Sequence, residues 1–136
     1  MTIRHVNPAG LVAMPEAFSQ VVTAAAGKLV FVSGQGAFDA DRKIVGWGDY
    51  YEQTKQAFRN LRTALAAVGA TPEHVVSTTM YLKDLHPEAL LAFVRGMDEA
   101  LEGKPFPPTA ATFVGVQSLA YPEMLVEVSA IAVLPG

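Results

Sequence analysis

Hydrophobic and polar residues alternate near the start of the chain in the way that β-strands require. Residues 18–25 (FSQVVTAA) and 29–35 (LVFVSGQ) are two such segments, separated by Gly27 and Lys28. A two-residue turn that contains glycine is typical of a tight hairpin. The pattern therefore predicts an antiparallel pair of strands at the beginning of the sheet.

After a polar loop at residues 39–48, the hydrophobic residues recur with the period of an α-helix. Asp49 followed by Glu52 is a variant of the capping box that begins helices, and Gly69 supplies a stop. Between them one face recurs at helical spacing, through Tyr51, Thr54, Phe58, Leu61, Leu65 and Val68. We expect this face to lie on the sheet.

A third strand and a second helix follow. Residues 75–82 (VVSTTMYL) are rich in branched side chains, and a strand, helix, strand succession indicates a right-handed crossover with parallel pairing. The second helix is predicted over 87–101, because Pro87 suits a first turn and Gly103 lies beyond its end. Its apolar stripe consists of Leu90, Phe93, Met97 and Leu101.

Two further strands are predicted within residues 106–134. The segment 104–108 (KPFPP), which leads from the second helix to these strands, cannot continue a helix and must cross the surface. The element order ββαβαββ predicts an α+β fold, a two-layer sandwich with both helices on one face of a mixed sheet. A chain of 136 residues without repeats or linkers suits a single domain, 1–136.

Composition narrows the functional classes. Hydrophobic residues make up 51% and charged residues 17%, against about 25% charged in ordinary domains, which indicates apolar surface buried in an oligomer. The net charge of −3 and scattered basic residues argue against nucleic acid or an anionic membrane as partners. The absence of cysteine excludes thiolate chemistry, and the three histidines lack metal-ligand spacing.

Without a signal-like or bilayer-length apolar segment, a cytoplasmic location is expected.

One carboxylate stands inside the last apolar segment. Glu127 is flanked on its face of the predicted strand by Leu125 and Ile131. A carboxylate in such surroundings is costly unless it is paired, exposed to a cleft or used in chemistry. Glu127 is therefore a candidate site residue, although pairing with backbone amides of a neighbouring subunit would also account for it.

Five segments share their order, spacing and content with one family: FSQVV, VFVSGQG, QTKQAFRNLRTALAAVGA, HVVSTTMYLKDL and FVGVQSLAYPEMLVEVSAIAVLP. Through them the chain resembles the Rid proteins, also called the YjgF, reactive intermediate deaminase or endoribonuclease L-PSP family. The resemblance implies a chorismate-mutase-like fold assembled as a homotrimer around a central β-barrel. It also implies small-molecule clefts between the subunits and hydrolysis of imines or enamines without a cofactor or metal.

The resemblance is incomplete at the site. Active members hold the substrate carboxylate with an arginine at the start of the penultimate strand, where this chain has Ala111, and no arginine occurs from Gly96 to the C-terminus. An arginine to carboxylate contact contributes roughly 1.5 to 3 kcal/mol, so its loss weakens binding of a small acid about 10- to 150-fold. Phe18 replaces a tyrosine of many active members, which removes a hydroxyl.

Other family positions persist, namely Ser33, Gly34, Gln35 and Glu127. The resemblance implies that Gln35 and Glu127 position water, and that Gly34 lets a ligand approach the backbone. Together with Phe18 and Phe113 they predict a cleft that favours a neutral or cationic ligand with apolar bulk. Phe18 and Phe113 are equally consistent with interface packing.

Two further residues have weaker claims to the site. Asn60 is expected to bond to a loop, and Arg95 is the nearest candidate to substitute for the missing arginine. Three functions remain open: a divergent imine or enamine deaminase, a non-catalytic metabolite-binding trimer, and a ribonuclease or translation inhibitor. The third is disfavoured because an acidic chain without paired histidines suits neither RNA binding nor RNA cleavage.

Overall fold

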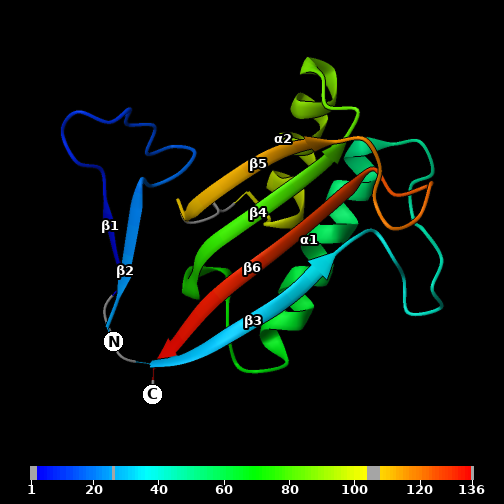
Figure 1. Ribbon diagram of the computed structural model, residues 1–136. Coiled ribbons are helices and arrows are strands. Elements are labelled where there is room, and N and C mark those ends of the chain that lie inside the picture. Colours follow the sequence, from blue (N-terminus) through cyan, green and yellow to red (C-terminus); the bar gives the residue numbers. More distant parts are fainter. Residues whose placement is uncertain (1–2, 26, 104–107, 136) are drawn as a thin grey trace.

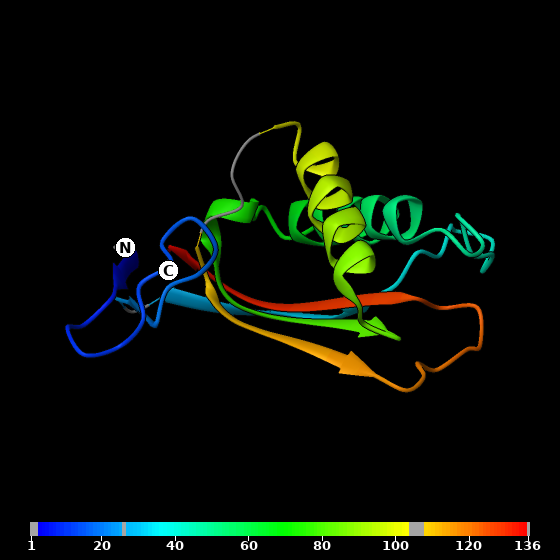
Figure 2. The same cartoon turned by 90° about the horizontal axis from the view of Figure 1, so that it is seen from above.

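The computed structural model describes residues 3–25, 27–103 and 108–135. Two helices pack on one face of a four-stranded sheet, so the molecule has two layers (Figures 1 and 2). The predicted α+β sandwich is confirmed. The elements in chain order are β1 (Ile3–Val6), β2 (Val21–Ala24), β3 (Gly27–Gln35), α1 (Tyr50–Ala66), a 3-10 turn (Pro72–His74), β4 (Val75–Lys83), α2 (Pro87–Ala100), β5 (Ala110–Val116) and β6 (Val126–Pro135).

The sheet is mixed, as predicted, but its parallel pair lies elsewhere. The strand order is β3-β6-β4-β5, in which β6 is antiparallel to both neighbours and only β4 and β5 are parallel. The crossover that joins parallel partners therefore runs through α2 and not through α1. The last strand occupies the centre because its alternate side chains are all buried beneath the helices: Val126, Val128, Ala130 and Ala132.

The predicted hairpin between residues 18–25 and 29–35 is wrong. Gly27 and Lys28, the expected turn, are already strand residues that pair with Pro135 and Leu134 of β6. The segment before them, β2, pairs instead with β1 in a separate two-stranded sheet, which stands beside the main sheet in Figure 1. The longer register with β6 prevails because it places Val30 and Val32 against the core.

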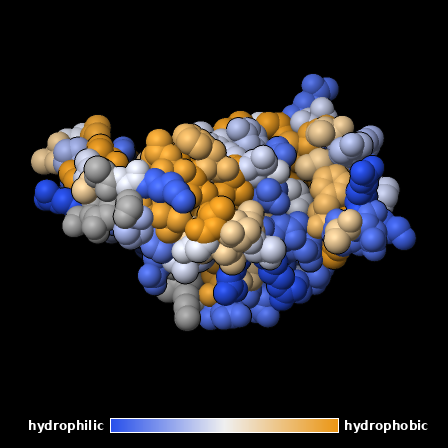
Figure 3. Space-filling model, turned by 90° about the horizontal axis from the view of Figure 1, so that it is seen from below, coloured by the Kyte–Doolittle hydropathy of each residue, from blue (hydrophilic) through white to orange (hydrophobic). Residues whose placement is uncertain are grey.

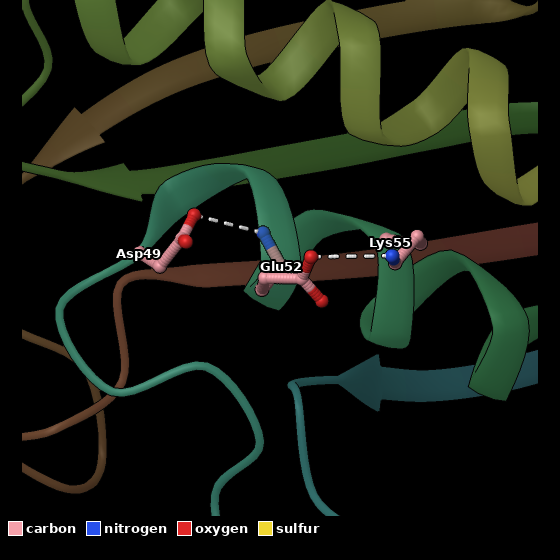
Figure 4. A network of polar contacts seen from close by, with 3 residues as sticks. All are labelled: Asp49, Glu52 and Lys55. Carbon is pink, nitrogen blue, oxygen red and sulfur yellow. Dashed lines mark hydrogen bonds and ion pairs between the residues drawn. The ribbon is translucent and has the colours of Figure 1, made fainter.

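The first helix begins where the sequence predicts. The Asp49 carboxylate accepts a hydrogen bond from the Glu52 backbone N–H at 3.0 Å, and Lys55 pairs with the Glu52 carboxylate at 3.2 Å (Figure 4). Most of the predicted face is buried, but Val68 is 49% exposed because the helix ends at Ala66. Two residues that the pattern did not select, Gln53 and Ala57, are fully buried.

The second helix packs through small residues and not through the whole predicted stripe. Its buried residues are Ala89, Phe93, Gly96 and Ala100. A Cβ atom at Gly96 would lie 2.7 Å from the Tyr51 carbonyl oxygen of α1, so the two helices approach closely only because this residue is glycine. Leu90, predicted as core, is 41% exposed.

Aromatic rings pack against one another between the layers. Phe93 of α2 meets Phe58 of α1 at 5.6 Å and Phe113 of β5 at 5.0 Å between ring centroids, in both cases edge to face. The predicted proline-rich crossing lies outside the described residues at 104–107. Neither α1 nor α2 is long and apolar enough to cross a membrane.

Candidate functional site

The candidate carboxylate lies on the sheet face that the helices leave uncovered. Its neighbours along β6, Val126 and Val128, are buried in the core, whereas Glu127 itself is half-buried and points to the other side. On β4 the residue opposite Glu127 is Tyr81. Neither of the two ion pairs within the described part of the chain involves Glu127. Its charge is therefore left without a cationic partner there.

Gly34 lies directly beneath this carboxylate. The ladder between β3 and β6 shifts register between Val32, which pairs with Ala130, and Gln35, which pairs with Val128, so Ser33 and Gly34 form a bulge. A Cβ atom at Gly34 would lie 2.5 Å from the Glu127 Oε1 atom. The glycine bulge thus allows the Glu127 side chain to lie across the backbone of β3.

Gln35 makes a local contact with this bulge. Its side-chain Nε2 donates a hydrogen bond to the Ser33 carbonyl oxygen at 3.1 Å, across the bulge. The structure therefore brings Gly34 and Glu127 together at the bulge, with Ser33 beside them, and we call these three residues the Glu127 group. Gln35 is tied to the bulge by its bond to Ser33, but it pairs with Val128 and so belongs to the opposite face of the sheet from Glu127. A carboxylate over open backbone can hold a water molecule and exchange a proton with it.

The bulge supports a direct prediction about Gly34. In Gly34→Ala the new methyl group must displace the Glu127 side chain, whose distal atoms can move at little cost in stability. We expect a change of less than about 1 kcal/mol in the free energy of unfolding, because the contact is with a flexible side chain. Any activity that depends on the Glu127 carboxylate should fall at least about 10-fold, since small misplacements are costly in catalysis. Unfolding in urea and rate assays on the same variant would separate the two effects, and unchanged activity would contradict the assigned contact.

Two of the remaining predicted residues lie on the helix side of the sheet. Ala111 and Phe113 of β5 line a cavity of about 530 Å³ together with Met80 of β4. Its other wall is formed by Leu90 and Met97 of α2. We call this space the α2 cavity.

Phe18 lies close to this cavity along the chain. Glu16 and Ala17, which precede it, line the cavity, and the Ser19 N–H donates a hydrogen bond to the Thr109 carbonyl oxygen at 3.0 Å. Thr109 itself is a lining residue. The segment around Phe18 is thereby tied to the beginning of β5.

The sheet separates the two sets of residues within one chain. Phe113 and Val128 both pair with Met80 and share the helix face, whereas Glu127 is the next residue along β6 and takes the opposite face. A single cleft lined by Phe18, Phe113 and Glu127 is therefore not formed by one chain alone.

Asn60 and Arg95 have scaffold contacts. The Asn60 amide donates hydrogen bonds to the carbonyl oxygens of Gly36 and Phe38, at 2.9 and 2.8 Å, which confirms its expected bond to a loop. The Arg95 guanidinium lies 5.3 Å from the centre of the Tyr51 ring on α1. Arg95 is thus engaged between the helices and does not line the α2 cavity.

Gln53 supports the site and was missed from the sequence. This fully buried side chain accepts a hydrogen bond from the Leu125 N–H at 2.8 Å and donates to the carbonyl oxygens of Glu123 and Gly46, at 2.9 and 3.2 Å. It therefore holds the loop that leads into β6, two residues before Glu127. The only signal was a polar residue beside the apolar face of the first helix.

One titratable group near this end of the sheet is perturbed. Burial raises the pKa of the Tyr50 hydroxyl, and the Asp84 carboxylate raises it further. The hydroxyl donates a hydrogen bond to the Lys83 carbonyl oxygen at 2.6 Å, so its role is to join α1 to the end of β4. Across the described residues no three histidine or acidic side chains gather into a metal-binding group.

A mixed sheet covered by two helices, with a carboxylate over a glycine bulge, defines a protein of the YjgF-like fold class. The chain belongs to the endoribonuclease L-PSP family, which includes the Rid and RutC proteins, because the family model of that description matches residues 11–134.

Known relatives agree with this assignment. Protein DfrA of Myxococcus xanthus is 38% identical over 117 residues, covering 85% of this chain and 84% of that protein. A RutC family protein of Synechocystis is 33% identical over 139 residues, covering 99% of both chains. The crystal structure of YyfB from Yersinia pestis, a conserved Rid family protein of unknown function, superposes with a TM-score of 0.86 at 36% identity, covering 98% of this chain and 100% of that one.

Proposed function

We propose that this protein is a hydrolytic deaminase of imines or enamines whose substrates are not anchored through a carboxylate. The observation that carries the proposal is the Glu127 carboxylate, which lies over Gly34 without a cationic partner in the described chain. A carboxylate held open in this way can serve as a general base. Ala111 in an apolar cavity supports the absence of a carboxylate anchor.

The proposed reaction is addition of water to a carbon–nitrogen double bond. With the substrate as its iminium ion, whose nitrogen already carries the extra proton, Glu127 takes a proton from the water as the water oxygen bonds to the carbon, which gives a neutral carbinolamine. Glu127 then delivers this proton to the nitrogen. As the carbon–nitrogen bond breaks, the hydroxyl group of the intermediate gives its proton back to Glu127, and a carbonyl compound and ammonia are formed. Glu127 finally passes the proton to the ammonia, which leaves as ammonium. The carbonyl oxygen of Ser33, which Gln35 holds through a hydrogen bond, orients the water. The balance requires only water, so no cofactor or metal enters the mechanism.

The complete site is proposed to form between copies of the chain in a homotrimer. The uncovered sheet face exposes Leu29, Phe31 and Ile131 by 59%, 71% and 36%, and large apolar patches mark interaction surfaces. Figure 3, which views the molecule from the β3 side, shows hydrophobic residues gathered in one broad patch. In the proposed assembly the Glu127 group of one subunit faces the α2 cavity of the next. Sedimentation equilibrium should give three times the chain mass.

Ammonia release from imines generated in situ tests the proposal. An amino acid oxidase would supply imines with a carboxylate and an amine oxidase would supply imines without one, each with and without the purified protein. We expect the purified protein to accelerate ammonia release from the imines without a carboxylate, relative to the reaction without the protein. No acceleration with either kind would overturn the proposed deaminase.

Ala111→Arg provides a prediction about specificity. An arginine at this position should form a charge-assisted hydrogen bond with a ligand carboxylate, which contributes roughly 1.5 to 3 kcal/mol. We therefore expect imines that carry a carboxylate to be hydrolysed about 10- to 150-fold more efficiently, measured as kcat/KM. Ala111→Met is the matched control because it adds similar length without charge. An equal gain in both variants would contradict the electrostatic explanation.

A non-catalytic metabolite-binding trimer is the second candidate, and the α2 cavity favours it because a preformed apolar cavity binds ligands without chemistry. Saturable stabilisation in thermal unfolding without turnover would identify this function. The name of the endoribonuclease L-PSP family gives reason for a third test, of RNA cleavage. Cleavage by the purified protein that is lost in Glu127→Ala would replace both other functions.

A further inference from the structure

The α2 cavity exists because α2 approaches α1 more closely than it approaches the sheet. Gly96 brings the helix backbones together, since a Cβ atom there would meet Tyr51 and Thr54. Figure 2 shows α2 inclined to the sheet, with its beginning near the strands and its end standing away from them. The cavity lies as a wedge between α2, from Leu90 to Asp98, and the strands β4 and β5.

The walls of this wedge are apolar side chains of substantial size. Leu90 and Val94 of α2 line the cavity and are each 41% exposed, so they are available to a ligand. Met80, Ala111 and Phe113 form the opposite wall, where the small side chain of Ala111 leaves the space open. The volume of about 530 Å³ lies within the range of small-molecule sites, roughly 300 to 1,000 Å³.

The polar groups that line the cavity do not favour binding of an acidic ligand. Thr78 and Thr109, both buried lining residues, satisfy each other through a hydroxyl hydrogen bond of 2.7 Å. Among the described lining residues the charged side chains are two acids, Glu16 and Asp98, both exposed to solvent. They favour a cation near the cavity and oppose an anion.

We propose that the α2 cavity is a specificity pocket for the aryl or branched alkyl group of an amine-derived cation, so that the substrates are iminium ions of hydrophobic primary amines. This inference rests on the proposed deaminase function and names its substrate class. Such an iminium ion reacts with water to give a hydrophobic aldehyde or ketone and an ammonium ion. The class of reaction that supplies it is the two-electron oxidation of a primary amine.

Direct binding measurements on the full chain test the pocket independently of turnover. Calorimetric titrations would compare 2-phenylethylamine with phenylacetate, which has the same aryl group and the opposite charge, and with methylamine, which has the charge without the bulk. We expect saturable binding of 2-phenylethylamine, binding of phenylacetate at least about 5-fold weaker because of the acids, and no saturable binding of methylamine.

Two variants fill the pocket from opposite walls. Ala111→Met and Val94→Trp should each weaken binding of 2-phenylethylamine at least about 10-fold by occupying apolar contact area. Val94 is partly exposed, so its substitution preserves the fold even if Ala111→Met does not. Asp98→Asn should reduce the preference for the amine over phenylacetate, whereas the control Glu73→Gln, at an exposed residue of the 3-10 turn, should not.

The outcomes distinguish this inference from the proposed function. Tighter binding of phenylacetate than of the amine, or undiminished amine binding in both filled variants, would overturn the proposal that the α2 cavity is a specificity pocket. If this proposal is overturned but imines without a carboxylate are still hydrolysed, the deaminase proposal stands. If the amine binds as expected and no imine is hydrolysed, the pocket stands and the deaminase proposal fails.

Discussion

Glu127→Gln is expected to lower the rate of imine hydrolysis by roughly 100-fold or more while leaving the fold intact. Glutamine has nearly the same shape but cannot accept the proton of the attacking water, and general acid–base catalysis contributes about 10²- to 10⁴-fold. Stability should change little, because the carboxylate forms no ion pair within the described chain. Steady-state ammonia release and thermal unfolding would measure the two quantities.

Glu123→Gln is the matched control for this experiment. Glu123 precedes β6 by three residues, and it contacts the scaffold through its backbone carbonyl oxygen, which accepts a hydrogen bond from Gln53. Its substitution should leave hydrolysis within about 2-fold of the wild type, since surface changes away from special features have small effects. Retention of full activity in Glu127→Gln would remove this carboxylate from the mechanism.

Gln53→Ala is expected to produce the largest loss of stability, roughly 2 to 5 kcal/mol, because it removes three hydrogen bonds of a buried side chain. The Leu125 N–H loses its acceptor, and two loop carbonyls lose their donor. Such a loss is large against the 5 to 15 kcal/mol of a typical domain. Urea unfolding at equilibrium would measure it.

Gln56→Ala on the same helix is the control for Gln53→Ala. The Gln56 side chain is only half-buried and donates one hydrogen bond, to Asn60, so its removal should cost about 1 kcal/mol or less. Gln53→Ala should also lower activity, since the freed loop leads into the strand that carries Glu127. Equal stability losses in the two variants would show that the buried hydrogen bonds around Gln53 are not important.

The parts of the fold that could be predicted depend on local patterns. The start of α1 follows from the Asp49 side chain and the N–H of Glu52, three residues apart, and the start of α2 follows from Pro87. Strand pairing depends on distant partners. Gly27 and Lys28 resemble a turn until β6, about a hundred residues later, offers them a longer ladder. The parallel pair was misplaced for the same reason, because β6 inserts between β3 and β4.

The candidate site, too, could be predicted only in part from the sequence. Family resemblance alone connected Gly34 with Glu127, and a missing Cβ atom explains their approach. Phe113 pairs with Met80 and therefore takes the other face of the sheet from Glu127 within one chain, so the cleft predicted between subunits must draw these two residues from different chains. No sequence pattern indicated Gln53, since its three partners are brought together only by the fold.

The sequence by itself determined both helices, every strand except β1, the α+β class, the family and the identity of the residues available for chemistry. Side-chain period, caps and motifs are local properties, so they can be read without coordinates. The tertiary structure decided which strands pair, which face each candidate occupies, and that close packing at Gly96 leaves an apolar cavity beside Ala111. These depend on contacts between segments far apart in the chain, whose relative stability only the complete packing determines.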